Sequence, residues 1–499
     1  MRTIINNILI CTAIIIFSAS CSDEWLELHP SNNMLQNEAI VTVTDARYAI
    51  NGVYFEIQRS AYYGGNMTYQ PDLLGGDMRT WGLSTTRTGD IYRWDFAAGN
   101  APAAIWQQAY AVIRQANNVL AAIDNVEYSS NTLTPAQRAV EDIERDYIKG
   151  EALMARAMAH FDICRVYGYP YLKDNGASLG AVIVKEALPR DAKPKRSTVA
   201  ETYNELIIPD LKNAINLMES RTRANTQGRF TKWSAKLLLS RVYLYMGDWE
   251  NALREAEECI AGAEASGCAL YTNANYTNAW ASKHSSESLF EIINLTGQNA
   301  GASGVAGHAA AHNASANHEI GITLSFYNHL NEDTDDVRLR LLRRGSIAMF
   351  ANEFPGFILK YTSGGTTPAN SNIILYRLSE AYLNAAEAAA RLGNQNDKAL
   401  QYLNAIVSRA NPANSLTGDV TWQNVLEERR KELFGEGHRF FDLLRNGLTV
   451  YRENDDLPNV MRLEDRAKVI DWYNFRAVMP IPIMELEMNP NIQPNVWNN

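Results

Sequence analysis

Pairs of amphipathic helices are the feature that most restricts the fold of this chain. The segment "TKWSAKLLLSRVYLYMGDWENALREAEECI" has apolar residues at helical spacing on both sides of Gly247–Asp248, which predicts two helices joined by a tight turn. Four residues stand at the offsets of a tetratricopeptide-type turn: Tyr243, Gly247, Trp249 and Ala252. The small Ala252 would let the two helices approach closely, while the aromatic side chains wedge the outer side of the pair.

The same pattern recurs elsewhere in the chain. "YRLSEAYLNAAEAAARLGNQNDKALQYLNAIVSRANP" predicts a second pair that turns at Gly393 and ends at Pro412, and "IWQQAYAVIRQANNVLAAI" predicts a further helix. Generic helical packing would also explain one such pair. Several in one chain favour a stacked, solenoid-like scaffold, because each pair needs a neighbour to bury its apolar face. We therefore predict a mostly α fold, a tetratricopeptide-like scaffold of helix pairs.

Capping residues fix where two other helices begin. Thr134 is followed by Pro135 and by Gln137, which are favourable at the N-cap, first and third helical positions. Apolar residues then recur at helical spacing through Ile143, Tyr147 and Phe161, until Gly168–Pro170 end the helix. Thr198 and Glu201 repeat the same capping pattern.

Long loop-rich insertions interrupt this helical pattern. Residues 60–101, 168–196, 267–330 and 448–499 are rich in Gly, Asn, Pro and Thr. Compact domains seldom keep so much irregular chain unless it has a function. Aromatic residues are common in these stretches, so we expect a rigid helical scaffold that displays a ligand-binding face built mainly by the insertions at 60–101 and 267–330.

The N-terminus predicts export and lipidation. One basic residue, a short apolar run and the small residues before Cys21 are typical of a bacterial lipoprotein signal, although Ser18 departs from the preferred aliphatic residue. We therefore predict a signal peptide over residues 1–20, a lipid on Cys21, and one domain over 21–499 that is anchored to a membrane and does not span it. An ordinary secretory signal is the alternative.

The net charge and the cysteines limit which partners and which disulfides we expect. The formal net charge of −10 argues against a nucleic-acid partner, which would require a basic face. Besides Cys21, three cysteines remain in the exported chain. Cys164 falls in a helical run and is expected to be buried. Cys259 and Cys268 could form a bridge at a helix end, but the sequence does not predict a required disulfide.

Three histidines raise the question of a zinc site. His308, His312 and His318 have the spacing of a large class of zinc proteases. That pattern also needs a Glu beside the first His and a Gly at the turn, and Ala309 and Ser315 occupy those places. The segment reads as a Gly- and Ala-rich loop. We predict little or no zinc binding, no metal requirement and no catalysis by this loop.

A second group of charged residues could suggest an enzyme. In "EERRKELFGEGHRFFDLLRNG" the acidic residues could supply a glycosidase pair, but acids and bases alternate, which favours ion pairs within a structural helix. In "DTDDVRLR" the acids could suggest calcium, yet the Gly of a calcium loop is missing. We expect Asp336 and Arg338 to form a structural pair.

Six ordered blocks resemble the SusD/RagB family of Bacteroidetes outer-membrane nutrient-binding lipoproteins. They are "IWQQAYAVIRQANNVL", "YIKGEALMARAMAHFDICRVYGYPYL", "GRFTKWSAKLLLSRVYLYMGDWENAL", "ILYRLSEAYLNAAEAAARLG", "EERRKELFGEGHRFFDLLRNG" and "MPIPIMELEMNPNIQPN". The resemblance runs from Cys21 to the C-terminus. It implies a glycan-binding lipoprotein that acts with a TonB-dependent, SusC-like transporter. Asp23 and Glu24 resemble the signal that sends some such lipoproteins to the cell surface. Some members of the family handle peptides instead.

Candidate ligand contacts follow from sugar chemistry and from this resemblance. A sugar ring has an apolar face and a fringe of hydroxyls, so its site needs an aromatic platform beside planar hydrogen-bonding groups. Trp81 and Trp94 are the candidate platforms, with Arg79 and Asn100 as the polar partners and Trp280 as the opposite wall. In the family a Trp with Arg and Asn from this part of the chain contacts glycan. A core or hinge position is the alternative for each Trp.

Two classes of function therefore stay open. The first is a non-catalytic binder of glycan, with a peptide-binding member of the same family as the alternative. The second is a secreted hydrolase that uses the histidine loop or the acidic block. The sequence contains no Ser or Cys nucleophile motif, no phosphate loop and no complete metal motif, so we expect no enzyme and no cofactor.

Overall fold

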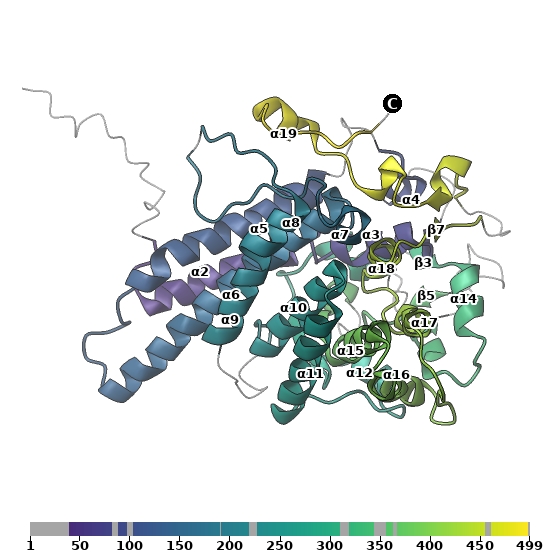
Figure 1. Ribbon diagram of the computed structural model, residues 1–499. Coiled ribbons are helices and arrows are strands. Elements are labelled where there is room, and N and C mark those ends of the chain that lie inside the picture. Colours follow the sequence, from purple (N-terminus) through teal and green to yellow (C-terminus); the bar gives the residue numbers. More distant parts are fainter. Residues whose placement is uncertain are drawn as a thin grey trace, which may run out of the picture.

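The structure is a computed structural model that describes residues 39–497, except 82–87, 97–102, 190, 219–226, 310–318, 344–355, 363–366 and 455–460. Within these residues most of the chain is helical (Figure 1). The helices of the scaffold are α2 (Val43–Gln58), α5 (Ala103–Ala122), α6 (Pro135–Tyr167), α9 (Ile208–Leu217), α10 (Lys232–Met246), α11 (Trp249–Ala265), α15 (Leu378–Leu392), α16 (Asn396–Ala410) and α17 (Trp422–Glu432). The mostly α, tetratricopeptide-like prediction is confirmed.

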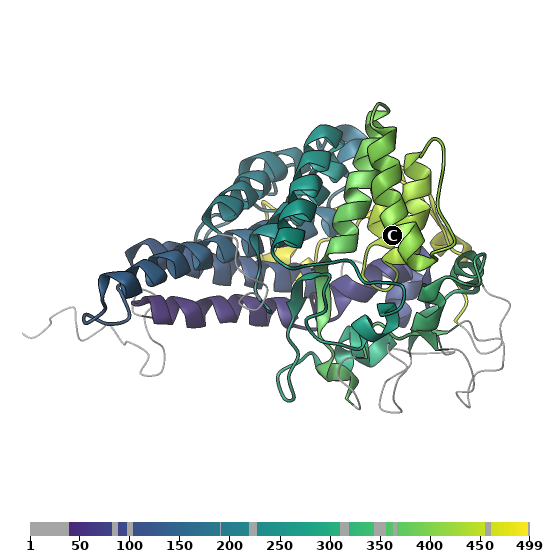
Figure 2. The same cartoon turned by 90° about the horizontal axis from the view of Figure 1, so that it is seen from below.

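The scaffold helices pack in sequence order as one continuous array. Contacts run from α2 to α5, α5 to α6, α6 to α9, α9 to α10, α10 to α11, α11 to α15, and from α15 to both α16 and α17. Figure 2 shows α2 and α6 extending together to one side, while α10, α11, α15 and α16 stand beside one another. Each helix therefore buries its apolar stripe against the next one, as in a repeat protein.

Local signals set the ends of these helices where the sequence predicts them. Thr134 and Gln137 form a reciprocal capping box at the start of α6, and Gly168 is the residue at its C-terminal cap. Gly247 ends α10 in the left-handed conformation at φ 75°, which glycine adopts without steric cost. Asp248 then caps α11, so the tight turn of the helix pair is confirmed.

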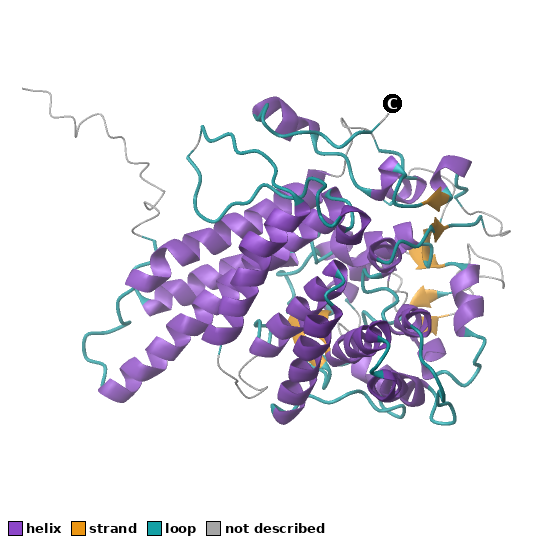
Figure 3. Ribbon diagram, in the orientation of Figure 1, coloured by secondary structure: helices purple, strands orange, loops and turns teal. Residues whose placement is uncertain are grey.

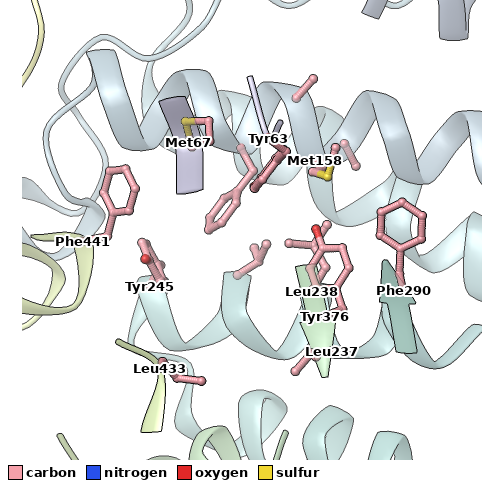
Figure 4. Packing of buried hydrophobic residues seen from close by; sticks show 14 of the residues in the cluster. Tyr63, Met67, Met158, Leu237, Leu238, Tyr245, Phe290, Tyr376, Leu433 and Phe441 are labelled. Atoms are coloured by element: carbon pink, nitrogen blue, oxygen red, sulfur yellow. The ribbon is translucent and has the colours of Figure 1, made fainter. Parts of the chain in front are cut away.

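The hydrophobic core includes the buried residues of α6, which pack against α10 and its neighbours. From Tyr147 onward nearly every residue of α6 is buried, whereas Ile143 in the first turns is 43% exposed. Figure 4 shows Met158 from α6 facing Leu238 from α10, with Phe290 and Tyr376 alongside. The predicted apolar face of α6 therefore reaches the core only from Tyr147 onward, and the turns before Tyr147 are mostly exposed.

Short elements join the scaffold. The strands are β1 (Met78–Thr80), β2 (Ser288–Ile292), β3 (Ile320–Ile322), β4 (Leu342–Arg343), β5 (Phe357–Ile358), β6 (Ile373–Arg377), β7 (Val450–Tyr451) and β8 (Val469–Ile470). They pair antiparallel as β1–β3, β2–β6, β4–β5 and β7–β8, and Figure 3 shows one group of strands at the right of the view and another among the helices near its centre. The short helices are α3 (Asn66–Gly75), α4 (Gly89–Arg93), α7 (Tyr171–Asp174), α8 (Val199–Thr202), α12 (Tyr276–Trp280), α13 (Val305–Ala309), α14 (Leu324–Leu330), α18 (Arg439–Arg445) and α19 (Ile483–Met488).

The three described cysteines are buried thiols. Cys164 is 2% exposed in α6, as predicted. No disulfide joins Cys259 to Cys268, and the Cys259 thiol donates a hydrogen bond to the carbonyl oxygen of Trp233 at 3.2 Å. Burial raises the pKa of the Cys164 thiol to about 12, so it is held as an unreactive thiol. Cys21 lies outside the described residues.

Candidate ligand-binding face

A two-stranded sheet joins the two loop-rich insertions. Strand β1 pairs antiparallel with β3, with Met78 opposite Ile322 and Thr80 opposite Ile320. The Trp81 amide extends the ladder by donating to the carbonyl oxygen of Glu319 at 2.7 Å. Segments from 60–101 and 267–330 therefore lie side by side. The labels of β3, β5 and β7 stand close together in Figure 1, away from the far end of α2.

The start of β1 is fixed to the rest of the fold by charge. Asp77 pairs with Arg430 of α17 at 2.7 Å. The carbonyl oxygen of Asp77 also accepts a hydrogen bond from the Thr323 amide at 2.9 Å, just after β3. The sheet is thus held both to the scaffold and to the second insertion. The segments that follow β1 and precede β3 are therefore attached to a rigid sheet.

Arg79 is buried at the centre of β1. Its side chain is 0% exposed, and one Nη donates to the carbonyl oxygen of Met461 at 2.9 Å. The guanidinium carbon lies 5.1 Å from the centre of the Trp81 ring and 6.0 Å from that of Tyr92, which are cation–π distances. Arg79 therefore connects the aromatic residues of the first insertion to the C-terminal segment near Met461.

Trp81 and Trp94 are buried as well. They are 3% and 1% exposed, respectively. The Trp81 indole lies so close to Gly321 that a Cβ built at that position would stand 2.2 Å from Nε1, which explains the glycine in β3. Trp94 ends α4 at φ 58°, packs against Phe440 at 5.5 Å between ring centroids and lies 4.8 Å from the guanidinium carbon of Arg452. Neither ring presents an open face for stacking.

Trp280 belongs to a different cluster. It ends α12, is 4% exposed, and has the Lys360 Nζ atom 4.6 Å from its ring centre. Arg377 lies on the same ring at 5.4 Å. The structure therefore brings Arg79, Trp81 and Trp94 into one region. Trp280 lies elsewhere, among the buried charged residues around Arg377 and Glu432, which we call the charged core. Asn100 lies outside the described residues. Direct ligand contact by the five candidates stays a prediction, and for the four described ones burial favours a structural role.

The acidic block forms ion pairs, but most of them join other segments, whereas the sequence predicted pairs within the helix; Lys431 with Glu428 is such a local pair. Glu432 is 0% exposed and lies 2.6 Å from Arg377 and 2.7 Å from Arg409. Arg338 pairs with Asp336 at 2.5 Å, which confirms the expected pair. The charges of these arginines outweigh the effect of burial and hold the pKa of Glu432 well below its ordinary value. A carboxylate held in this way is a poor proton donor for glycoside hydrolysis.

His308 also has a structural environment. It is 2% exposed in α13, with Nδ1 3.1 Å from a carboxylate oxygen of Glu319 and its ring 5.4 Å from that of Tyr69. His312 and His318 lie outside the described residues. Among the residues that the structure does describe, no three His, Cys, Asp or Glu side chains are grouped so that they could hold a metal ion. The weak zinc binding expected of this loop stays a prediction.

Sequence reasoning missed the exposed aromatic side chains. Tyr451 is 70% exposed because Val450 and Ile470 turn inward from β7 and β8, which leaves Tyr451 and its partner Val469 on the outer face. The main chain of Tyr451 lies against Gly76, two residues before β1. The alternation around "TVYRE" could have indicated this outward residue. Phe55 in α2 is also 51% exposed. The sequence did not single it out, because it stands within a regular helical pattern.

These elements define the class of the protein: a helical-repeat scaffold that carries a loop-built face at one end of its array. Two family models match the chain, one described as the SusD family over residues 347–497 and one as "Starch-binding associating with outer membrane" over 24–244. Within the described part of the chain no helix is long and apolar enough to cross a membrane.

Solved structures and curated relatives agree with these models. A protein of Bacteroides vulgatus ATCC 8482 described as sugar binding is 41% identical, with a TM-score of 0.83 over 92% of this chain and 99% of that one. A SusD superfamily protein of the same organism is 35% identical, with a TM-score of 0.82 over 92% and 100%. The SusD-like protein P2 of Formosa agariphila is 24% identical over 95% of this chain and 96% of its own. The chain belongs to the SusD family.

Proposed function

We propose that this protein is a non-catalytic cell-surface lipoprotein that binds oligosaccharide or polysaccharide and delivers it to a partner TonB-dependent outer-membrane transporter of the SusC-like type. The observation that carries the proposal is the 41% identity, over nearly the whole of both chains, to a protein described as sugar binding. The alternative within the family is a peptide ligand.

The ligand face is the region around β1 and β3. Arg79, Trp81 and Trp94 form its base, and their cation–π contacts hold that base rigid. Asn100 belongs to the same insertion and offers a donor and an acceptor together. At the edge, Tyr451 is 70% exposed and adds an aromatic ring with a hydroxyl group, which is the chemistry that a sugar ring stacks on.

A binding role agrees with the state of the acidic residues. Glu428, Glu432 and Asp442 are each within 2.7 Å of an arginine nitrogen in the buried core. Two carboxyl groups that hydrolyse a glycoside must instead face the substrate, and one of them must carry a proton. The acidic block therefore supports the fold, and a hydrolase is the less favoured function.

Membrane attachment comes from Cys21. A Cys21→Ala variant should lose lipid labelling and either leave the membrane or keep its signal peptide. Membrane retention and labelling at the normal level in this variant would refute the anchor. No basic amphipathic segment is expected to take over the role, because the chain carries a net charge of −10.

The transporter contact would involve the helical face and the tail "MPIPIMELEMNP". In α19, Met484 is 56% exposed and Met488 is 71% exposed, and such apolar side chains are typical of a protein interface. A stable complex of this kind buries more than about 2,000 Å². Extraction in mild detergent at native expression should yield the lipoprotein together with an outer-membrane transporter, and recovery of the free lipoprotein alone would count against the complex.

Ligand class is tested by titration calorimetry with panels of oligosaccharides and peptides. We expect binding to an oligosaccharide, weakened several-fold by Tyr451→Ala, because an aromatic contact contributes about 0.5–1.5 kcal/mol. Val140→Ala is the control: this apolar side chain is 65% exposed, but lies near the start of α6, away from β7. Binding to peptides alone would establish the alternative ligand.

A further inference from the structure

A second open site lies on the scaffold, apart from the β1–β3 face. A groove of about 510 Å³ runs between the second half of α2 and the segment that follows β2. Its lining residues are Asn51, Tyr54, Phe55, Gln58, Gly228, Phe290, Ile292, Ile293, Leu295 and Gln298. None of them belongs to the strands of the face, and the volume falls in the range of small-molecule sites.

The floor of the groove is aromatic. Phe290 is 2% exposed, and its ring centroid lies 4.3 Å from that of Phe230 and 5.8 Å from that of Tyr54. The Tyr54 hydroxyl donates to a carboxylate oxygen of Glu151 at 2.7 Å, so this ring is fixed in place. Phe55 stands at the mouth with 51% of its surface exposed. The groove thus combines a packed floor with one accessible ring.

The outer wall is held rigidly. Leu295 and Gln298 exchange two main-chain hydrogen bonds of 3.0 Å, which close the turn between them. The Gln58 side-chain amide donates to the carbonyl oxygens of Ile293 at 2.6 Å and of Gln298 at 3.1 Å, and so ties this turn to α2. Gly228 approaches the wall so closely that a Cβ there would stand 2.5 Å from Ile293. A site built this way needs little ordering when a ligand binds.

The polar groups at the rim are amides. Asn51 and Gln298 are exposed, and no hydrogen bond within the described part of the chain engages either side-chain amide. Each can donate and accept, which matches the hydroxyls of a sugar. No lining residue carries a charge, although the Arg59 guanidinium lies beside the groove, 5.2 Å from the centre of the Phe55 ring, in a cation–π contact. Apolar rings beside uncharged amides are the surroundings that a pyranose ring requires.

From this arrangement we propose that the groove is a second carbohydrate site, which binds one or two units of a neutral glycan by stacking on Phe55 and by hydrogen bonds to Asn51 and Gln298. A long polysaccharide could then be held at the scaffold and at the face at the same time. Two linked contacts of this kind strengthen binding beyond either contact alone. The site is additional to the proposed function, and shares with it only the class of ligand.

Titration calorimetry of the mature chain with neutral hexasaccharides tests the site. The probes are maltohexaose, laminarihexaose, cellohexaose and mannohexaose. The variants Phe55→Ala, Asn51→Ala and Gln298→Ala should each weaken binding at the groove by about two- to tenfold, as expected for one lost stacking or hydrogen-bonding contact. Tyr473→Ala is the matched control, because this tyrosine is 85% exposed and lies outside the groove. All of these side chains are exposed, so the variants should fold normally.

Amide hydrogen exchange gives a second and independent measurement. A bound hexasaccharide should slow exchange in residues 293–298 in the wild type and in Tyr451→Ala, and in Phe55→Ala the same protection should require about two- to tenfold more hexasaccharide. Glycan binding that is unchanged in all three groove variants, without protection of 293–298, would overturn the groove and leave the proposed function standing. Binding of apolar peptides in the groove would overturn its sugar chemistry. No binding of any glycan would overturn both proposals.

Discussion

Replacement of Glu432 by glutamine is the sharpest test of the charged core. Glu432 is the last residue of α17 and is 0% exposed. Its carboxylate oxygens lie 2.6 Å from Arg377, 2.7 Å from Arg409 and 3.4 Å from Arg338. Glutamine has nearly the same shape but no charge. The variant therefore removes the electrostatic interaction while it leaves the packing almost intact.

The loss of stability in Glu432→Gln depends on the acidic residues that still pair with the arginines. Removal of one partner from a buried ion pair typically costs about 3–5 kcal/mol, because the other charge is left buried without compensation. Here Arg377 keeps Glu436 at 2.7 Å and Arg409 keeps Glu287 at 2.6 Å. The remaining acids reduce the cost, so we expect a loss of about 3 kcal/mol, at the lower end of that range. For a chain of this length the entropy of unfolding is about 1 kcal/mol per kelvin, which converts the loss into a Tm lower by about 3 °C.

The effect should depend on pH in a defined direction. The pKa of Glu432 is lowered in the folded state, so its contribution is complete above the unfolded value of about 4.3 and declines as the pH falls toward the folded value. The difference between Glu432→Gln and wild type should therefore be constant from about pH 6 to 8 and should shrink below about pH 4. A difference that grows on acidification would contradict this assignment.

The assay is thermal and urea unfolding followed by circular dichroism at pH 7 and at about pH 3, which lies inside the range where the difference should shrink. The control is Glu464→Gln, because Glu464 pairs with Arg466 at 2.7 Å while its side chain is 69% exposed. Exposed pairs contribute about 0–1 kcal/mol, so this variant should unfold close to wild type. Equal stability of Glu432→Gln and Glu464→Gln at pH 7 would refute the reasoning on the buried pairs.

Three further predictions concern other parts of the molecule. Trp94→Ala should lower the free energy of unfolding by about 3–5 kcal/mol in urea titrations, because the ring is 1% exposed; a near-normal value would show that the ring is not in the core. Thr134→Ala should cost about 0.5–2 kcal/mol by loss of the cap of α6, with Thr132→Ala as the unchanged control. Metal analysis of protein purified without a metal-affinity tag should find far less than one zinc per chain, and stoichiometric zinc that is lost when His308, His312 and His318 are replaced would contradict this.

The scaffold could be predicted because its signals are local. The capping box of Thr134 and Gln137 and the left-handed Gly247 act within a few residues, and the structure confirms both. Pairing of Asp336 with Arg338 is also local and is confirmed at 2.5 Å. The partners of Glu432 could not be predicted, because Arg338 and Arg377 come from segments far away in the sequence.

The candidate site was harder to predict for a physical reason. Composition shows that Trp81 and Trp94 fall in a loop-rich insertion, but it does not show which side of the chain they face. Their burial depends on Arg79 and Arg452, which fill the space beside the rings, and Arg452 lies more than 350 residues further along the chain. An aromatic residue in a loop can stack on a ligand or anchor the loop, and only tertiary contacts distinguish the two.

Buried polar contacts hold the base of the face to the last helices of the scaffold. Asp72 accepts hydrogen bonds of 3.0 Å from the amides of Gly437 and Arg439, and Asp77 pairs with Arg430. These links join α3 and β1 to the segment from α17 to α18, so the chain that follows α17 is fixed on its inner side. Because the charged core holds the base of the face, we expect substitutions of exposed residues such as Tyr451 to have little effect on folding. We therefore predict that a change in the ligand bound requires no change in the buried ion pairs.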